Sequence, residues 1–352
     1  MTQQRLLDWR WARYAFSLTI PLAVAASFQL EGAWSFAAIG YAFGLLPLLE
    51  LILVPNGRNL TAAEREAVRL DPRFDAWLWA MIPVQWAMLG WFFWTVSATD
   101  WLGVTWWGWV SAMGLLCGVL GINVAHEIGH RPGRKAAWGA YALLLTSFYT
   151  HFYVEHNRGH HRNVATAEDP ATAQKGEWVW WFWLKSWWGG WWHGLQLEAK
   201  RCRRAGRLPW GWHNEVLRWQ VVQVGAWGAV FMAFGMEVAV AWWVAGAIGG
   251  LLLETVNYIE HYGLKRMKLN AHRYERVEPG HSWNSNHPLG RVVLFELSRH
   301  SDHHARPEKP YAQLDHLDDA PQLPTGYPGM MLLSWLPPLY FAVMHPLLKA
   351  RQ

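Results

Sequence analysis

Residues 155–161 read Glu-His-Asn-Arg-Gly-His-His, which places three imidazoles within six residues. If this stretch is helical, His156 and His160 lie one turn apart on the same face, whereas His161 points about 100° away from His160. A segment of this kind can face two metal ions instead of one. We therefore expect the rest of the chain to be organised around it.

Two further histidine clusters occur, one on each side of this stretch. Residues 126–130 read His-Glu-Ile-Gly-His, and residues 300–304 read His-Ser-Asp-His-His. With one isolated histidine, the candidate ligands are His126, His130, His156, His160, His161, His261, His300, His303 and His304. A mononuclear site takes about four to six donors, so nine predict two ions that keep open positions. Imidazole suits zinc, copper, iron and nickel, so the histidines alone do not name the metal.

Other histidines are less informative. We leave His151, His281 and His287 outside the ligand set, and we expect residues 284–287 to build a cytoplasmic loop.

The composition is too apolar for an ordinary soluble enzyme. The chain has 352 residues, of which 52% are hydrophobic and 16% charged, and it contains 29 tryptophans. Its mean hydropathy is nevertheless near zero, at −0.02. These values indicate a protein that lies partly in the bilayer and partly in a water-facing cap.

Charge and cysteine content exclude several classes. Cys117 and Cys202 form no CxxC pair, so the chain offers no rubredoxin-like, iron–sulfur or zinc-ribbon module and no disulfide framework. Any electrons must therefore come from another protein. The net charge of +5 is spread over arginines beside apolar spans, which favours anionic lipid headgroups and no nucleic acid as partners.

The apolar segments predict an all-α, polytopic membrane protein that forms a single domain over residues 1–352. Each predicted span is close to the ~20 residues that cross a bilayer core. The six spans are approximately 14–30, 33–54, 76–96, 104–125, 219–236 and 238–259, and the cytoplasmic segments that carry the histidines are approximately 126–218 and 260–352.

The positions of lysine and arginine predict the orientation. The three short loops between paired spans carry none, so the positive-inside rule places both termini, the long loops and every histidine cluster in the cytoplasm. We interpret residues 1–13 as a retained interfacial segment.

The apolar stretches 136–153 and 329–348 are predicted to be non-spanning helices. A crossing at the first would separate the histidine clusters, and the second contains three prolines. The run Trp178–Trp192 is predicted to form an aromatic belt at the headgroups, with ordinary hydrophobic packing as the alternative.

Two other functions remain open at this point. The sequence His126-Glu127-Ile128-Gly129-His130 matches the HExxH motif of zinc metalloproteases, which would make an intramembrane protease. Such a protease needs three protein ligands and leaves six clustered histidines unexplained. A metal transporter would place its ligands near the bilayer midplane, whereas the first three predicted spans contain no histidine.

Six stretches resemble the integral-membrane alkane 1-monooxygenases. They are residues 126–130, 155–162, 257–264, 281–287, 299–305 and 323–329. The resemblance is close over roughly residues 120–330, and it covers the first four spans mainly through hydropathy. The wider superfamily includes xylene methyl hydroxylases and acyl-lipid hydroxylases and desaturases, and the motif at 257–264 favours the hydroxylases. Ser298 and Arg131 depart from residues common in the family, but neither is a candidate ligand.

The resemblance implies a non-haem di-iron enzyme in a bacterial inner membrane. It would use O₂ and two electrons to convert medium-chain n-alkanes into primary alcohols, and the electrons would come from NADH through a reductase and rubredoxin. A cytoplasmic face that could steer such an acidic carrier is formed by Arg131, Arg134, Lys135, Arg201, Arg203 and Arg204.

Further residues are expected around the metal centre. Ligating imidazoles usually donate their other N–H to a carboxylate or a carbonyl. The candidates for such contacts are Glu127, Glu155, Asp169, Asn257, Glu260 and Asp302. Phe43 lies about 15 Å along the helix from the cytoplasmic end of the second span. If its side chain blocks the far end of the substrate channel, the channel would suit an alkane of about ten carbons. Gly114 and Gly118 could leave room for a substrate channel, or could instead pack helices closely.

Overall fold

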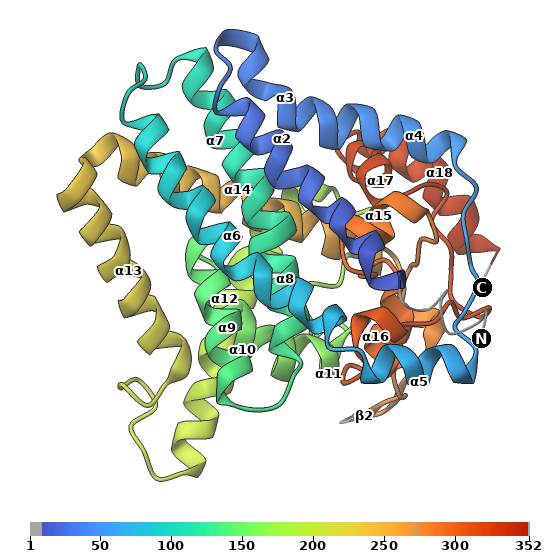
Figure 1. The fold of residues 1–352 in the computed structure, drawn as a ribbon. Helices are drawn as coiled ribbons and strands as arrows, with labels where there is room; N and C mark the ends of the chain where they lie inside the picture. Colours follow the sequence, from blue (N-terminus) through green and yellow to red (C-terminus); the bar gives the residue numbers. More distant parts are fainter. Residues whose placement is uncertain (1–8, 272, 351–352) are drawn as a thin grey trace.

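The computed structural model describes residues 9–271 and 273–350, and these residues are predominantly helical (Figure 1). The symbol η marks short 3₁₀ or π segments. The first half contains η1 (Arg10–Leu18), α2 (Thr19–Ser27), η2 (Gly32–Phe36), α3 (Ala37–Gly40), η3 (Tyr41–Leu45), α4 (Leu46–Ile52), α5 (Ala62–Leu70), α6 (Arg73–Val96), α7 (Val104–Leu116), η4 (Cys117–Ile122), α8 (Asn123–Gly129), α9 (Arg134–Thr146), α10 (Phe152–Glu155), η5 (His156–His160) and α11 (His161–Asn163).

The second half carries three long helices and then a series of shorter elements. It contains α12 (Val179–Arg204), α13 (Glu215–Phe234), α14 (Met236–His261), β1 (Lys268–Asn270), β2 (Arg273–Tyr274), η6 (Pro279–His281), α15 (Pro288–Val293), α16 (His300–Ala305), η7 (Tyr311–Gln313), α17 (Tyr327–Ser334) and α18 (Pro337–Lys349). The two strands pair antiparallel as a small hairpin. The predicted all-α membrane fold is therefore confirmed.

Four helices of the described residues are long and apolar enough to cross a membrane. They are Gly32–Ile52, Arg73–Val96, Val104–Gly129 and Met236–His261, and they coincide with four of the six predicted spans. A helix satisfies all its backbone groups internally, which a segment in lipid requires. The predicted interfacial segment 1–13 lies largely outside the described residues.

The other two predicted spans are helical but do not meet the same criteria. The first, 14–30, is divided between η1 and α2, and Arg10 and Arg13 lie in the opening turns of η1, ahead of the predicted span. The second corresponds to α13, in which Gln220 and Gln223 interrupt the apolar sequence. Many of its large apolar side chains, including Met232, are exposed, and α13 lies at the periphery of the bundle (Figure 1). A total of six spans stays a prediction.

The continuous helix formed by α7, η4 and α8 lies at the centre of the bundle and runs parallel to α14. Glycines bring the two helices together: a Cβ on Gly114 would lie 2.6 Å from Ile248, and one on Gly249 would lie 2.6 Å from Cys117. Small residues of this kind allow close approach of helices in membranes. Because the two helices run in the same direction, His126 and His261 come to lie at the same end of the bundle.

The two doubtful apolar stretches do not form long helices. Helix α9 has 13 residues and ends at Thr146, which is too short to cross a bilayer. The stretch 329–348 is divided between α17 and α18. Both findings agree with the predicted non-spanning helices. Several indoles of α12, among them Trp181 and Trp188, are exposed, as an aromatic belt requires.

Candidate metal centre

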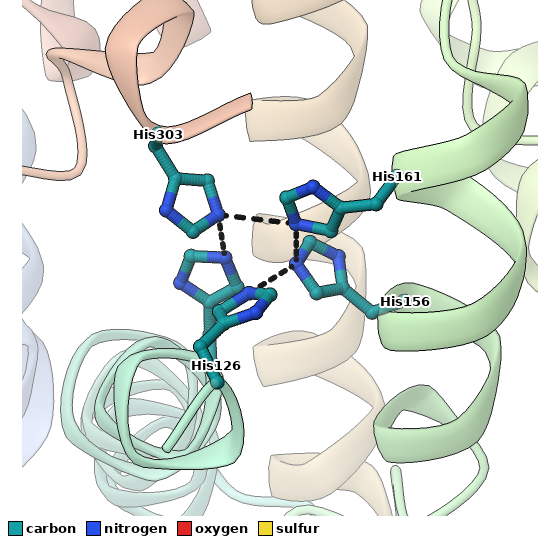
Figure 2. Close-up of side chains that lie close together, drawn as sticks. His126, His156, His161 and His303 are labelled. Carbon is teal, nitrogen blue, oxygen red and sulfur yellow. Dashed lines mark hydrogen bonds between the residues drawn. The ribbon is translucent and has the colours of Figure 1, made fainter. Parts of the chain in front are cut away.

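The nine predicted histidines gather into two adjacent groups. Within each group the potential donor atoms all lie within 4.8 Å of one another. One group contains His126, His130, His156, His161 and His303, and the other contains His160, His261, His300 and His304. In Figure 2 the labelled rings of the five-histidine group point toward one another from three segments of the chain, α8, η5–α11 and α16.

Each segment brings its histidines to this point for a local reason. His126 lies on α8 and His130 follows the last residue of that helix, so the two lie one helical turn apart and reach the same group. On α16, His300 and His304 have the same spacing and reach the four-histidine group, whereas His303 points to the other. A single short helix therefore supplies donors to both groups.

Residues 155–161 also supply donors to both groups, but with a different pairing from the one expected. His156 shares its group with His161, and His160 belongs to the other group. The reason is that residues 156–160 form a π-helical turn, which is wider than an α-helical turn. Residues five apart therefore replace residues four apart as neighbours on one face.

The donor set fits metal ions. In the five-histidine group the Nε2 atoms of His126 and His303 are 2.9 Å apart, and those of His156 and His161 are 3.0 Å apart. In the other group the Nε2 atoms of His300 and His304 are 2.9 Å apart. Neighbouring donors around one ion with metal–nitrogen bonds of about 2.1 Å lie about 3 Å apart.

One further atom supports this fit. Nε2 of His160 is buried and has no hydrogen-bond partner among the described residues, although it belongs to the four-histidine group. A buried polar atom without a partner is rare and calls for an unseen one. A metal ion would be that partner.

Burial keeps most of these rings in the neutral form that binds metal. It lowers the pKa values of five histidines outside the spans well below the ordinary value, and nearby rings reinforce the effect: His156, His161, His300, His303 and His304. His160 differs, because burial lowers its pKa but the carboxylate of Asp169 raises it, with a net value of about 9. Metal binding must therefore displace a proton from His160.

Two of the six predicted neighbouring residues contact a candidate ligand. Nδ1 of His160 donates to Oδ2 of Asp169 at 3.0 Å, as expected for a carboxylate that orients a ligand. Oε2 of Glu260 lies 3.1 Å from Nε2 of His300. Glu260 therefore faces the donor nitrogens of the four-histidine group and not the outer edge of a ring.

The other four form different contacts. Glu127 accepts from the backbone N–H of Tyr311 and lies 3.6 Å from Arg131. Glu155 accepts from Nδ1 of His193 at 3.1 Å.

Asn257 donates to Glu254 at 3.2 Å. Asp302 accepts from Arg306 and from Lys309, so it anchors α16 instead of holding a ring.

Sequence reasoning missed several residues around the centre. The hydroxyl of Tyr327 donates to Oε1 of Glu260 at 2.6 Å. The side chain of Asn284 accepts from the N–H of Ser301 at 2.8 Å, so the segment 281–287 holds α16 in place. His151, His281 and His287 are buried or nearly so, but none of them belongs to either histidine group. Both Asn284 and Tyr327 lie in stretches that resemble the family, 281–287 and 323–329, but their partners are distant in the sequence, so their contacts were not predicted.

An apolar cavity lies among the helices beside the centre. Phe43 and Gly118 line it, whereas Gly114 does not, because the space at Gly114 is taken by Ile248. Asn123 also lines the cavity and lies one helical turn before His126. The full lining is Ile20, Ala42, Phe43, Leu46, Leu115, Gly118, Val119, Asn123, Leu252, Leu253, Val256, Gly290, Val293, Leu294, Leu297, Tyr327, Pro328 and Met331.

The sequence can now be compared with known proteins. Residues 104–334 match the model of the fatty acid desaturase family. The helical membrane fold and the two histidine groups agree with that class of protein. Alkane 1-monooxygenase 2 of Pseudomonas aeruginosa is 35% identical over 346 residues, which are 97% of this chain and 91% of that protein. Within the desaturase family, the chain therefore belongs to the alkane 1-monooxygenases.

Two other relatives agree with this placement. Alkane 1-monooxygenase 1 of Alcanivorax borkumensis is 37% identical over 303 residues, which are 86% of this chain and 74% of that protein. The xylene/toluene monooxygenase hydroxylase component of Pseudomonas putida is 27% identical over 239 residues, which are 67% of this chain and 63% of that protein. The similarity to the aromatic hydroxylase is thus weaker and shorter.

Proposed function

We propose that this protein hydroxylates the terminal carbon of medium-chain n-alkanes, using O₂ and two electrons to form 1-alcohols. The observation that carries the proposal is the apolar cavity that begins near Phe43 and includes Asn123, one turn from His126. An alkane offers nothing to hydrogen-bond, so only shape and apolar contact can recognise it. The alkane 1-monooxygenases named above support the choice of substrate.

The residues that would hold two iron ions are the nine histidines of the two groups. When bound, the iron ions supply the oxidising power that protein side chains lack for an unactivated C–H bond. Asp169 holds the ring of His160 in one orientation, and Tyr327 fixes the carboxylate of Glu260. The apolar lining, including Val256 and Leu297, excludes water and leads the terminal carbon toward the histidines.

Electrons would enter from the side of the five-histidine group. His130 and His161 are partly exposed, whereas every ring of the four-histidine group is buried. We propose rubredoxin as the donor, supplied by an NADH-dependent reductase. Arg134, Arg203 and Arg204 are exposed and available to an acidic carrier, whereas Arg131 pairs with Asp75 at 2.8 Å.

Arg201 is also less available to a carrier, because it pairs with Glu198 at 2.7 Å. We further propose that residues 1–352 form one domain in the bacterial inner membrane. Its termini and metal centre would face the cytoplasm, which is the orientation that the arginine distribution favours.

The test combines metal analysis with an activity assay. Purified protein is expected to contain two iron ions per chain and to convert octane to 1-octanol when rubredoxin, its reductase and NADH are supplied. His156→Ala, His261→Ala and His303→Ala should each lower both iron content and activity, because no other donor replaces the lost ring. Full iron and activity in all three variants would refute the ligand assignment.

The same preparation discriminates the alternative functions. Preferred oxidation of xylene would move the protein to the aromatic methyl hydroxylases, and oxidation of an acyl lipid would move it to the acyl-lipid hydroxylases and desaturases. Stoichiometric zinc with peptide hydrolysis would indicate a protease, although Glu127 contacts Tyr311 and Arg131 instead of the histidine groups. Metal uptake into vesicles without octane oxidation would indicate a transporter.

A further inference from the structure

A second cavity is lined by arginines and lies outside both histidine groups. It is formed where η1 meets residues 56–60 and residues 291–314. Five guanidinium groups line it, those of Arg10, Arg13, Arg58, Arg291 and Arg299. None of the nine candidate ligands is among its lining residues. The metal centre and the alkane cavity therefore do not account for it.

Carboxylates neutralise this positive charge only in part. Glu296 lines the cavity and is buried, and it accepts from Arg13 at 2.7 Å and from Nε of Arg291 at 2.6 Å. Glu64 contacts Arg10 and Arg58 from outside the lining. Among the described residues, two carboxylates thus pair with five arginines, and positive charge remains in excess around an open space.

The backbone at Glu296 shows that the cluster is built and not incidental. Phe295 and Glu296 both have positive φ angles, of 51° and 60°, which residues other than glycine rarely adopt. This conformation turns the carboxylate of Glu296 toward Arg13 and Arg291. The surrounding contacts must compensate for the strained backbone.

Arg299 leaves one hydrogen-bond donor without a partner in this cavity. Its side chain is only 3% exposed, and its terminal nitrogens donate to the carbonyl of Leu314 at 2.6 Å and to that of Arg58 at 3.0 Å. Its Nε–H has no hydrogen-bond partner among the described residues, and Oε2 of Glu296 lies 3.9 Å from Nε, an ion pair that is too long for a hydrogen bond. A buried guanidinium donor of this kind needs an acceptor, because leaving it unpaired is costly.

We propose that this arginine cavity binds a phosphate-bearing anion. Guanidinium groups match phosphate oxygens in geometry and charge and often bind them in pairs. Arg291 and Arg299 form a buried floor, at 9% and 3% side-chain exposure, whereas Arg13 and Arg58 form an open rim, at 41% and 65%. Arg13 lies at the start of the first predicted span, the depth at which lipid phosphates lie, so an anionic lipid headgroup is the favoured source and free phosphate is the other.

The test compares binding by a rim variant with binding by a matched control. Full-length protein in neutral detergent is titrated with short-chain phosphatidylglycerol, and its affinity is measured together with its thermal stability. The double variant Arg13→Gln, Arg58→Gln is expected to bind about tenfold more weakly, because two charge-assisted contacts are lost. The control Arg69→Gln, Arg207→Gln changes two exposed arginines outside the cavity and should bind like the unaltered protein.

Competing probes then distinguish the source of the phosphate. Displacement by millimolar inorganic phosphate would identify a soluble ligand, and phosphatidylglycerol binding that resists phosphate would identify the lipid. Absence of binding to the unaltered protein, equal affinity of the rim variant and the control, or displacement by hexaglutamate but not by phosphate or phosphatidylglycerol would each overturn the proposal. If the double variant does not fold, Arg58→Gln alone replaces it, because that side chain is the most exposed of the rim.

Discussion

Asp169 is the residue on which the orientation of His160 depends. Replacing it with asparagine keeps the shape but removes the charge that holds Nδ1–H, so Asp169→Asn is expected to lower iron affinity about 10- to 100-fold. Iron retained after dialysis against a series of chelators measures the effect. Glu168→Gln changes the neighbouring exposed carboxylate and should retain iron normally. Equal iron loss in the two variants would show that Asp169 does not orient His160 for metal binding.

Phe43 is expected to limit the length of alkane that the cavity accepts. Truncation at Cβ frees about 4–5 Å, or about three to four carbons at about 1.25 Å per carbon. Phe43→Ala should therefore shift the preferred substrate toward longer alkanes while iron content stays unchanged. Product profiles by gas chromatography from hexane to hexadecane test this shift.

Phe36 is the matched control, because it lies in the same predicted span but does not line the cavity. If the product profile changes equally in Phe36→Ala, or changes in neither variant, Phe43 does not limit the length of alkane that the cavity accepts. Phe43 also contacts Trp335, with ring centroids 5.8 Å apart, so a Trp335→Phe variant shows whether packing alone alters the profile.

Single residues differ in how far the sequence revealed them. Asp169 was found because it follows a histidine cluster closely, and its contact with His160 is local in the chain. Tyr327 lies in the stretch 323–329 that resembles the family, but its contact with Glu260 was not predicted, because the two residues are 67 positions apart in the sequence. The contact between Glu155 and His193 was missed for the same reason, at a separation of 38 residues.

At the level of elements, π-helical turns are the feature that the sequence concealed. Three occur among the described residues, at Tyr41–Leu45, Cys117–Ile122 and His156–His160. The first carries Phe43, the second carries Gly118 and the third carries cluster histidines. Such turns tend to occur at functional sites, yet residue spacing is interpreted with the α-helical period. The nine histidines were therefore predicted, but not their division into groups.

The π turn at His156–His160 leaves no room for a side chain at Gly159. A Cβ there would lie 2.8 Å from His193 and 2.9 Å from Glu155. Gly159→Ala is therefore expected to cost about 1–3 kcal/mol of stability and to lower iron content, because the turn must shift. Thermal unfolding and metal analysis check both effects.

Gly129 provides the control for this substitution. It also lies within a histidine cluster, but a Cβ there would meet its nearest neighbour at 3.5 Å, which is ordinary contact. Gly129→Ala should therefore fold and bind iron normally. Equal tolerance of alanine at both positions would show that the turn at Gly159 is more adaptable than its contacts indicate.

At the scale of the whole molecule, hydropathy predicted the four longest apolar helices well. It could not decide the status of η1–α2 and of α13, because arginines or glutamines dilute their apolar sequence. Nor could it show that α7 and α14 run parallel in close contact, since that arrangement depends on facing glycines such as Gly114 and Gly249.

Cysteine labelling of intact cells can decide the number of spans. If α13 crosses the membrane, Glu237→Cys in the first turn of α14 should react with an impermeant maleimide from outside. Ala98→Cys, between α6 and α7, is the positive control, and Lys200→Cys should react only after lysis. The native cysteines, Cys117 and Cys202, are buried and should stay silent. Protection of Glu237→Cys in intact cells would exclude a crossing by α13 and, because His261 lies at the same end of the bundle as His126, a crossing by α14 as well.

The division of single helical turns between the two histidine groups has a consequence for how the protein acquires its metal. His160 ends the π turn and belongs to one group, whereas the adjacent His161 begins α11 and belongs to the other, and α16 likewise carries His304 and His303. A chain that captures a first ion is therefore expected to order histidines of the second group as well. Uptake should follow a steep, cooperative curve, and molecules that hold a single ion should be scarce at every stage of loading.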